Sequence, residues 1–335
     1  MDLATLWFVL IAVLWLGYLF LEGFDFGVGM LLRVLGRDER TRRVLVNTIG
    51  PVWDGNEVWL IVAAGATFAA FPGWYAGLFS AAYLPLLLVL LALIGRGVAF
   101  EYRGKIDSAR WRALWDTVIT GGSAVAALGV GLLLSWNVLG LPLDARGDRV
   151  GSAFAALRWE TLVGALGVAG FALLHGAVFL ALKTEGEVRE RARRLALRVA
   201  PVALAPLAAT LAVVQVREGS GWTLVPLGLA ALAAVLGWLR LAAGREGQAF
   251  AALGVVIAGT VATWFGALYP NVLPSTVDPA FSLTIADTAS SPYTLTVMTW
   301  VAAFGTPAVL VYQGWTYWVF RRRIGTRHIP EVHAP

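Results

Sequence analysis

Residues 16–29 of the chain read LGYLFLEGFDFGVG, and residues 50–60 read GPVWDGNEVWL. Each stretch lies in a long apolar segment and carries two carboxylic acids, Glu22 with Asp25 and Asp54 with Glu57. An acid near the middle of a bilayer costs about 2.5–3.5 kcal/mol to insert, so a spanning helix keeps one only where it has a role. Because both pairs are spaced i,i+3, the two carboxyls of each pair share one helical face. The pattern predicts a path for protons or cations.

The composition decides the class of protein. Hydrophobic residues make up 59% of the 335 residues and charged residues only 14%, and the mean hydropathy is +0.73. Because a soluble domain carries about 25% charged residues, we expect an integral membrane protein in contact with lipid. The basic residues lie in short loops between apolar segments, so we expect no nucleic-acid partner. The absence of cysteine excludes disulfides and thiolate metal sites.

A membrane-spanning helix needs about 20 mainly apolar residues. The sequence predicts nine such segments within one polytopic domain, residues 1–335. They are residues 3–32, 50–71, 75–98, 113–138, 158–182, 195–216, 222–241, 249–269 and 293–320. The first segment lacks a basic leader and a small-residue cleavage site, so we expect it to be a spanning helix and no cleaved signal.

The distribution of basic residues predicts the orientation. Arginine and lysine gather in residues 33–43, 103–112, 183–198, 240–245 and 321–327, whereas the opposite connections hold only Arg146, Arg149, Arg158 and Arg217. The positive-inside rule then places the N-terminus outside and the C-terminus in the cytoplasm, which agrees with an odd number of spans. The outer segment 270–292 contains four prolines and no basic residue, and we expect it to form an ordered extracellular cap.

With this topology the acids fall in the cytoplasmic halves of the first two spans, which we expect to be neighbours. Asp54, Asp25, Glu57 and Glu22 are therefore the candidates for a proton path, and we expect all four carboxyls to gather in the cytoplasmic half of the spans. The alternative is that they are interfacial groups that reach water and have no function. Arg96, at the end of the third span, is a candidate counter-ion, although an arginine at a helix end also snorkels to water by default.

Glycines accompany these acids, and two further polar residues need an interpretation. Gly23, Gly27, Gly29 and Gly55 are expected to permit close approach of helix backbones. Asp116 is expected to be satisfied by a helix dipole and nearby arginines. His175 lies in an apolar segment and invites a haem-ligand interpretation. Because no spanning segment offers a second histidine, we expect a packed core histidine and no metal site or cofactor in this chain.

Several motifs resemble one known family. They are GFDFGVGM (23–30), NTIGPVWDGNEVWL (47–60), AFP (70–72), YRGK (102–105), WR (111–112), WD (115–116), YPNVLPS (269–275), SLTI (282–285), TLTVMTWV (294–301) and YQGWTYW (312–318). In this order they resemble subunit II of the cytochrome bd-type quinol oxidases, and they extend over nearly the whole chain.

The resemblance implies more than the residues show. It implies nine helices in two four-helix bundles plus one peripheral helix, in a bacterial cytoplasmic membrane. It implies a partner, subunit I, which carries the b- and d-type haems and with which the chain oxidises quinol and reduces dioxygen to water. Asp25 and Asp54 match positions of the family, and the latter lies on its proton path. Small accessory subunits and a bound structural quinone are further features of some relatives.

A proton-coupled secondary transporter is the alternative from another functional class. Intramembrane acids and glycine-interrupted helices suit both interpretations. A transporter acts alone through a substrate site near the bilayer midplane, whereas an oxidase subunit assembles with a haem-bearing partner.

Overall fold

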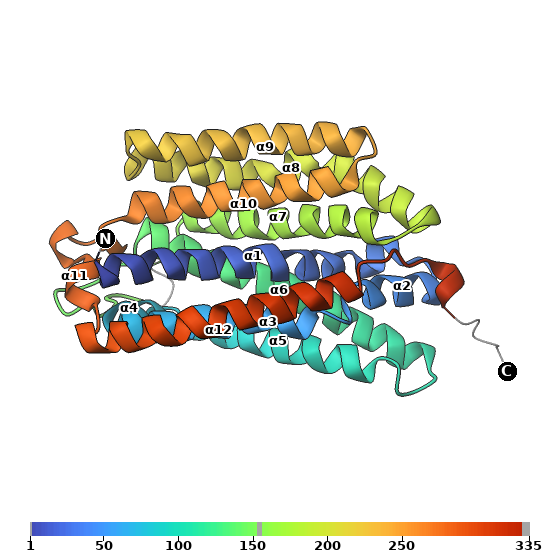
Figure 1. Cartoon of the computed structure of the whole chain (residues 1–335), viewed down its shortest axis with the longest axis horizontal. Coiled ribbons are helices and arrows are strands. Elements are labelled where there is room, and N and C mark those ends of the chain that lie inside the picture. Colours follow the sequence, from blue (N-terminus) through green and yellow to red (C-terminus); the bar gives the residue numbers. More distant parts are fainter. Residues whose placement is uncertain (1, 153–155, 330–335) are drawn as a thin grey trace.

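The computed structural model describes residues 2–152 and 156–329, and in this part the chain is almost entirely helical. The long helices are α1 (Leu3–Leu35), α3 (Trp53–Ala70), α5 (Tyr83–Tyr102), α6 (Ala109–Leu139), α7 (Trp159–Lys183), α8 (Gly186–Arg217), α9 (Leu224–Ala242), α10 (Glu246–Leu268) and α12 (Pro292–Val319). These helices lie roughly parallel to one axis, and α1 begins at the end of this axis opposite to the one where α12 ends (Figure 1). The short elements are α2 (Glu39–Ile49), α4 (Pro72–Ala81), α11 (Ile285–Thr288), strands β1 (Asn271–Leu273) and β2 (Leu283–Thr284), and 3₁₀ turns η1 (Gly221–Thr223), η2 (Pro279–Phe281) and η3 (Thr326–His328).

Eight helices of the described chain are long and apolar enough to cross a membrane. They are all the long helices except α3, whose polar residues 54–57 lower the hydropathy of a helix of only 18 residues. The number nine therefore stays a prediction.

One local prediction was wrong, and one helix was not anticipated. The segment 75–98 was expected to be one helix, but the chain forms α4 and α5 with a break at Ala82. Pro85 explains the break, because its ring clashes with the carbonyl of the residue four positions earlier and it has no N–H to donate. The loop after the first span contains the amphipathic helix α2, which begins where the Asp38 side chain accepts a hydrogen bond from the Thr41 amide at 2.8 Å.

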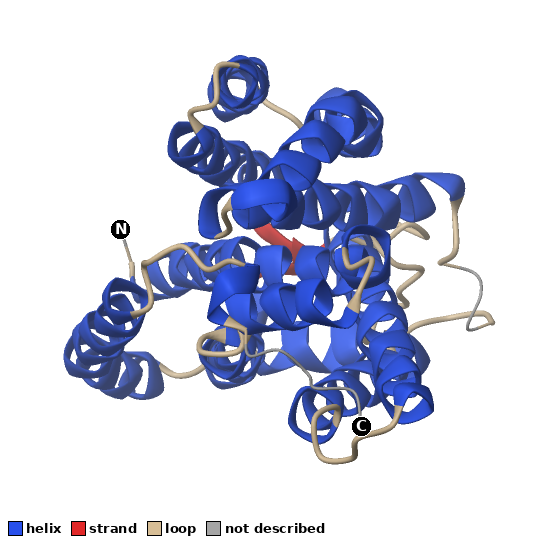
Figure 2. Cartoon of the chain, turned by 90° about the vertical axis from the view of Figure 1, so that its right-hand side faces the viewer, coloured by secondary structure: helices blue, strands red, loops and turns tan. Residues whose placement is uncertain are grey.

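The helices pack in two connected groups. Helices α7, α8, α9 and α10 form the first group. Helix α1 contacts α7 of this group and also contacts α3 and α6, and α6 contacts α5. Figure 2 shows the helices end-on, with the small strand pair lying across the far end of the packing. Helices α1 and α7 cross closely, because an added Cβ at Gly176 would lie 2.4 Å from the Gly27 carbonyl carbon.

The expected role of the glycines is only partly correct. Gly27 lies against the α7 backbone, and an added Cβ at Gly29 would overlap Ser123 of α6. Gly23 has ordinary van der Waals surroundings, and Gly55 faces open space. Gly55 therefore does not bring two helices together, because α3 turns this position away from the rest of the chain.

The segment between α10 and α12 is ordered, as predicted. Strands β1 and β2 pair antiparallel, and the segment is fastened to the end of α6 by hydrogen bonds of 3.0 Å from the Leu141 amide to the Pro274 carbonyl and 2.9 Å from the Thr276 amide to the Leu141 carbonyl. This cap covers the end of the helices at which the N-terminus lies (Figure 1).

Helix α12 lies along the edge of the molecule. Of its 28 residues, all of them described, only Leu295 is buried. Trp7 holds its first half through a 3.0 Å hydrogen bond from the indole Nε1 to Thr299 Oγ1. The segment after α12 crosses to the start of α8, where Arg327 and Glu185 form an ion pair of 2.6 Å.

Candidate functional site

The centre of the candidate site is a buried ion pair. Glu22 of α1 and Arg96 of α5 have no solvent exposure in this chain, and the Arg96 Nη1 donates a short hydrogen bond to Glu22 Oε1. The guanidinium also lies over the rings of Phe26 and Phe100, with centroid distances of 5.0 and 5.2 Å. These contacts favour the cation at a buried site.

Asp25, three residues further along α1, has a neutral partner. The Asn56 Nδ2 of α3 donates a hydrogen bond of 2.7 Å to Asp25 Oδ2, and both side chains are fully buried. The i,i+3 spacing thus directs Glu22 toward α5 and Asp25 toward α3.

A polar network continues from Asn56 to α12. The Asn56 Oδ1 accepts hydrogen bonds from the Tyr317 hydroxyl at 2.7 Å and from the Gln313 Nε2 at 3.2 Å. The Gln313 Oε1 in turn accepts a hydrogen bond of 2.9 Å from the indole Nε1 of Trp59. Three helices, α1, α3 and α12, are therefore linked through side-chain hydrogen bonds at the level of Asp25.

The two acids of α3 lie differently. Glu57 is half-buried and interacts electrostatically with Arg96, whereas Asp54 is exposed in the first turn of α3. Asp54 is therefore not part of the buried cluster that Glu22, Asp25 and Arg96 form. Asn56 points to α1, and a residue two positions earlier in a helix lies about 200° around the axis, so Asp54 points outward.

Three members of the site were missed by the sequence analysis: Asn56, Gln313 and Tyr317. They are neutral and therefore carry no charge to single them out in an apolar helix. Gln313 nevertheless had a recognisable feature, because it is the only side-chain amide in residues 293–320.

Several polar atoms of this cluster are buried and have no hydrogen-bond partner within the described chain. They are the Tyr18 hydroxyl, Glu22 Oε2, Asp25 Oδ1, and the Nε and Nη2 of Arg96. Tyr18 and the two acids belong to α1 and lie close enough to interact electrostatically with Arg96. Buried groups of this kind are normally satisfied by ordered water.

His175 lies in the core, on the other side of α1. Its ring stacks on Phe250 and Phe171, with centroid distances of 4.6 and 5.1 Å. Its Nε2 lies 3.0 Å from the Phe20 carbonyl oxygen, which can only accept, so this nitrogen carries the proton. The histidine is thus packed and hydrogen-bonded, as the sequence analysis favoured.

Asp116 is satisfied by arginines, as expected. Arg103 donates to Asp116 at 2.5 Å and also forms two hydrogen bonds of 2.9 Å with Glu39 of α2. Arg42 adds an ion pair of 3.4 Å with Asp116. This network joins the ends of α2, α5 and α6 at the same end of the molecule as the C-terminal segment.

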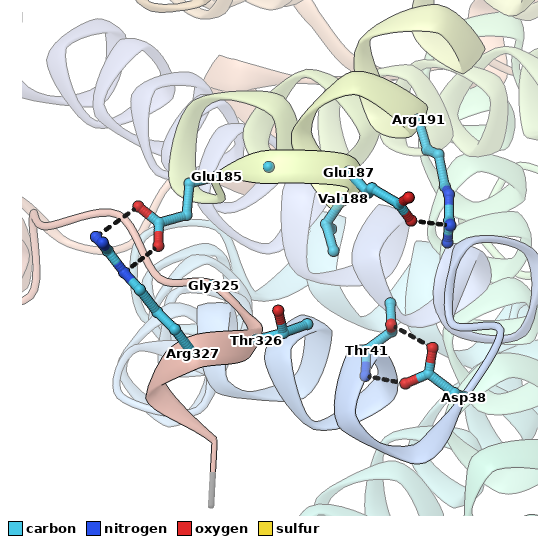
Figure 3. Close-up of a pocket in the computed structure, with 10 residues that line it drawn as sticks. Asp38, Thr41, Glu185, Glu187, Val188, Arg191, Gly325, Thr326 and Arg327 are labelled. Carbon is cyan, nitrogen blue, oxygen red and sulfur yellow. Dashed lines mark hydrogen bonds and ion pairs between the residues drawn. The ribbon is translucent and has the colours of Figure 1, made fainter.

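A polar pocket of about 420 Å³ lies at this end, where α2, the start of α8 and the C-terminal segment meet (Figure 3). Each acid that lines it already has a partner: Glu185 pairs with Arg327, Glu187 pairs with Arg191, and Asp38 caps α2 through Thr41. We therefore interpret the pocket as part of the contact that holds the C-terminal segment against α2 and α8.

An apolar groove of about 300 Å³ lies near the opposite end, between α1, α10 and the η1 turn. Phe8, Trp222, Phe265 and Tyr269 supply its aromatic walls, and the residues that line it carry no charge. Its lining suits a hydrocarbon chain; the structural quinone stays a prediction.

Comparisons with known proteins agree with this arrangement. The family model described as cytochrome bd terminal oxidase subunit II matches residues 3–320. The chain belongs to this family. It is 41% identical to the cytochrome bd ubiquinol oxidase subunit 2 of Bacillus subtilis, over 96% of this chain and 97% of that protein. It is 36% identical to the cytochrome bd-I ubiquinol oxidase subunit 2 of Escherichia coli strain K12, over 96% of this chain and 95% of that protein.

The fold is also similar to a solved structure, that of the bd oxidase from Geobacillus thermodenitrificans. The TM-score is 0.78 at 18% identity, and the match covers 96% of this chain and 98% of the other. As a cytochrome bd oxidase subunit II, the chain is a multi-pass membrane protein and part of a quinol oxidase complex. This assignment decides against a transporter that acts alone.

Proposed function

We propose that this chain is the haem-free subunit II of a respiratory quinol oxidase, which supports assembly of the haem-bearing subunit I and supplies part of a proton path from the cytoplasm. The observation that carries the proton path is the cluster around Asp25 and Glu22. Two acids and Arg96 lie fully buried inside the helices, and several of their polar atoms are free to bind water. A set of carboxyls with access to water can take up and pass on protons.

The path begins at the end of the molecule that holds the basic loops. Glu57 is half-buried and connects this end electrostatically to Arg96. Asp54 is exposed on the outer face of α3, so a path that uses Asp54 continues outside this chain. The neighbouring side chains Val58, Ile61 and Val62 are exposed and apolar, which suits a surface covered by a partner subunit or lipid.

The topology of this proposal requires α3 to cross the membrane as well, which brings the number of spans from eight to nine. The start of α1 and the end of α12 lie at opposite ends of the helices (Figure 1), and an even number of crossings would bring them to one side. Helix α3 has 18 residues and is about 27 Å long, close to the roughly 30 Å of the hydrocarbon core. The basic loops then place the N-terminus outside and the C-terminus in the cytoplasm of a bacterial cell. Helix α12 is the peripheral helix beside two four-helix bundles.

His175, the one histidine of the predicted spans, does not fit a haem. His175 uses its Nε2 for the Phe20 carbonyl, its ring is packed against Phe171 and Phe250, and its side chain has no solvent exposure. We therefore propose that the b- and d-type haems belong to subunit I. Accessory subunits stay a prediction.

The experiment that tests the proton path replaces Asp25 with Asn in the complete oxidase complex. Asn keeps the size of the side chain but removes the titrating proton. We expect normal haem bands together with the loss of most quinol-driven oxygen consumption.

The same measurement on Asp54→Asn tests the branch of the path that reaches the surface of this chain. Asp54→Asn should also lose most of the oxygen consumption with normal haem bands, and Asp54→Glu should retain part of the rate.

Asp107→Asn is the control, because Asp107 is an exposed acid in the α5–α6 loop that pairs with Arg112. It should leave the rate unchanged. Near-normal oxygen consumption in the Asp25 and Asp54 variants would show that protons enter elsewhere and would refute the path. Loss of the haem bands would assign the acids a structural role.

A further inference from the structure

The direction of the hydrogen bonds that connect α12 to Asp25 is fixed by chemistry. The indole N–H of Trp59 can only donate, so the Gln313 oxygen must accept it and the Gln313 amide nitrogen must face Asn56. The Asn56 oxygen must then accept from Gln313, which leaves the Asn56 nitrogen to donate to Asp25. This assignment does not depend on how either amide was oriented.

Tyr317 strengthens the same orientation. Its hydroxyl lies 2.7 Å from the Asn56 oxygen, which cannot donate, so the hydroxyl donates. Two donors on α12 thus hold the Asn56 amide in place. If Asn56 turned over, its nitrogen would face the Gln313 amide, which can only donate, and its oxygen would face a carboxylate oxygen of ionised Asp25, and both contacts are repulsive.

We propose that Gln313 and Tyr317 are positioning residues for Asp25: they lock the Asn56 amide so that it donates a hydrogen bond to the Asp25 carboxylate. The inference rests on the proposed proton path. It gives α12, which buries only Leu295 in this chain, a specific task on its inner face. A donor to the carboxylate favours the ionised form, so the network sets how tightly Asp25 holds a proton.

Other groups also act on Asp25. The titratable and charged side chains that interact with it are Glu22 and Tyr18 on α1, Glu57 on α3, Arg96 on α5 and Tyr317 on α12. Tyr317→Phe and Gln313→Leu leave all the charges of this set in place. Both variants remove a donor to the Asn56 oxygen without changing a charge, so a shift common to the two reports the loss of the network.

The test is the pH profile of oxygen consumption of the complete complex with Tyr317→Phe, Gln313→Leu and both together. Without its fixed donor, Asp25 holds its proton more tightly, so it stays loaded to higher pH and releases the proton more slowly. The double variant should show a lower maximal rate and an alkaline limb that moves up by about 0.5–1 pH unit. The haem bands should be unchanged, and each single variant should give a smaller shift in the same direction.

Tyr312→Phe is the matched control, because Tyr312 lies on the same helix, is 73% exposed and is not part of the network. Its profile should coincide with that of the unmodified complex. An unchanged alkaline limb in the two single variants and the double variant overturns the inference, provided that Asp25→Asn abolishes the rate. If Asp25→Asn itself retains the rate, the proton path has failed instead. If the double variant loses its haem bands, the inference is tested by the two single variants, and it is overturned if the alkaline limb of both profiles is unchanged.

Discussion

Replacing Arg96 with Met should prevent the oxidase complex from accumulating in the membrane. The substitution keeps an unbranched side chain of similar reach but removes the charge that neutralises Glu22. Both groups have no exposure to solvent, and leaving one partner of a buried ion pair uncompensated costs about 3–5 kcal/mol. This is a large part of the typical stability of a folded domain, about 5–15 kcal/mol. The yield of purified complex and its ratio of haem to protein measure the effect.

A second substitution shows whether the effect of Arg96→Met comes from the unpaired charge of Glu22 or from the lost packing of the Arg96 side chain. In Arg96→Met combined with Glu22→Gln no buried charge is left unpaired, so much of the yield should return. If Arg96→Met alone assembles with normal yield and thermal stability, Glu22 is protonated or solvated in the complex and the ion pair is not required for the fold.

Gly176→Ala should also strongly destabilise the protein. A Cβ at this position would lie 2.4 and 2.5 Å from the carbonyl carbon and the Cα of Gly27, which are backbone atoms that cannot move aside. Alanine gains up to about 1 kcal/mol over glycine from helix propensity. Overpacking of a core costs about 1–3 kcal/mol or more, and separating α1 from α7 would also disturb Asp25. We therefore expect a net loss, measured as a lower unfolding temperature of the complex.

Gly121→Ala is the matched control. Gly121 lies inside α6 and an added Cβ would meet no atom of this chain within 4 Å. The same substitution should there be neutral or slightly stabilising, because only the propensity changes. Equal unfolding temperatures for Gly176→Ala and Gly121→Ala would show that α1 and α7 do not cross as closely as described.

The boundaries of the helices could largely be predicted from the sequence, because long apolar segments have few alternatives in a bilayer. The break at Ala82 was missed, although Pro85 was visible, since a proline in a spanning segment can also be accommodated as a kink. Helix α2 was missed because it is short and amphipathic and lies in a loop recognised only by its charge.

The sequence by itself determined that this is a multi-pass membrane protein with acids at Glu22, Asp25, Asp54 and Glu57 that need an explanation. Length, hydropathy and the cost of inserting a charge are local properties, and residue spacing alone reveals them. Only the tertiary structure decided which helix faces meet. The rotation of α3 turns Asn56 inward and Asp54 outward, and Gln313 and Tyr317 reach Asn56 from a helix more than 250 positions away along the chain. Such partners are set by the packing of whole helices, which no local pattern in the sequence specifies.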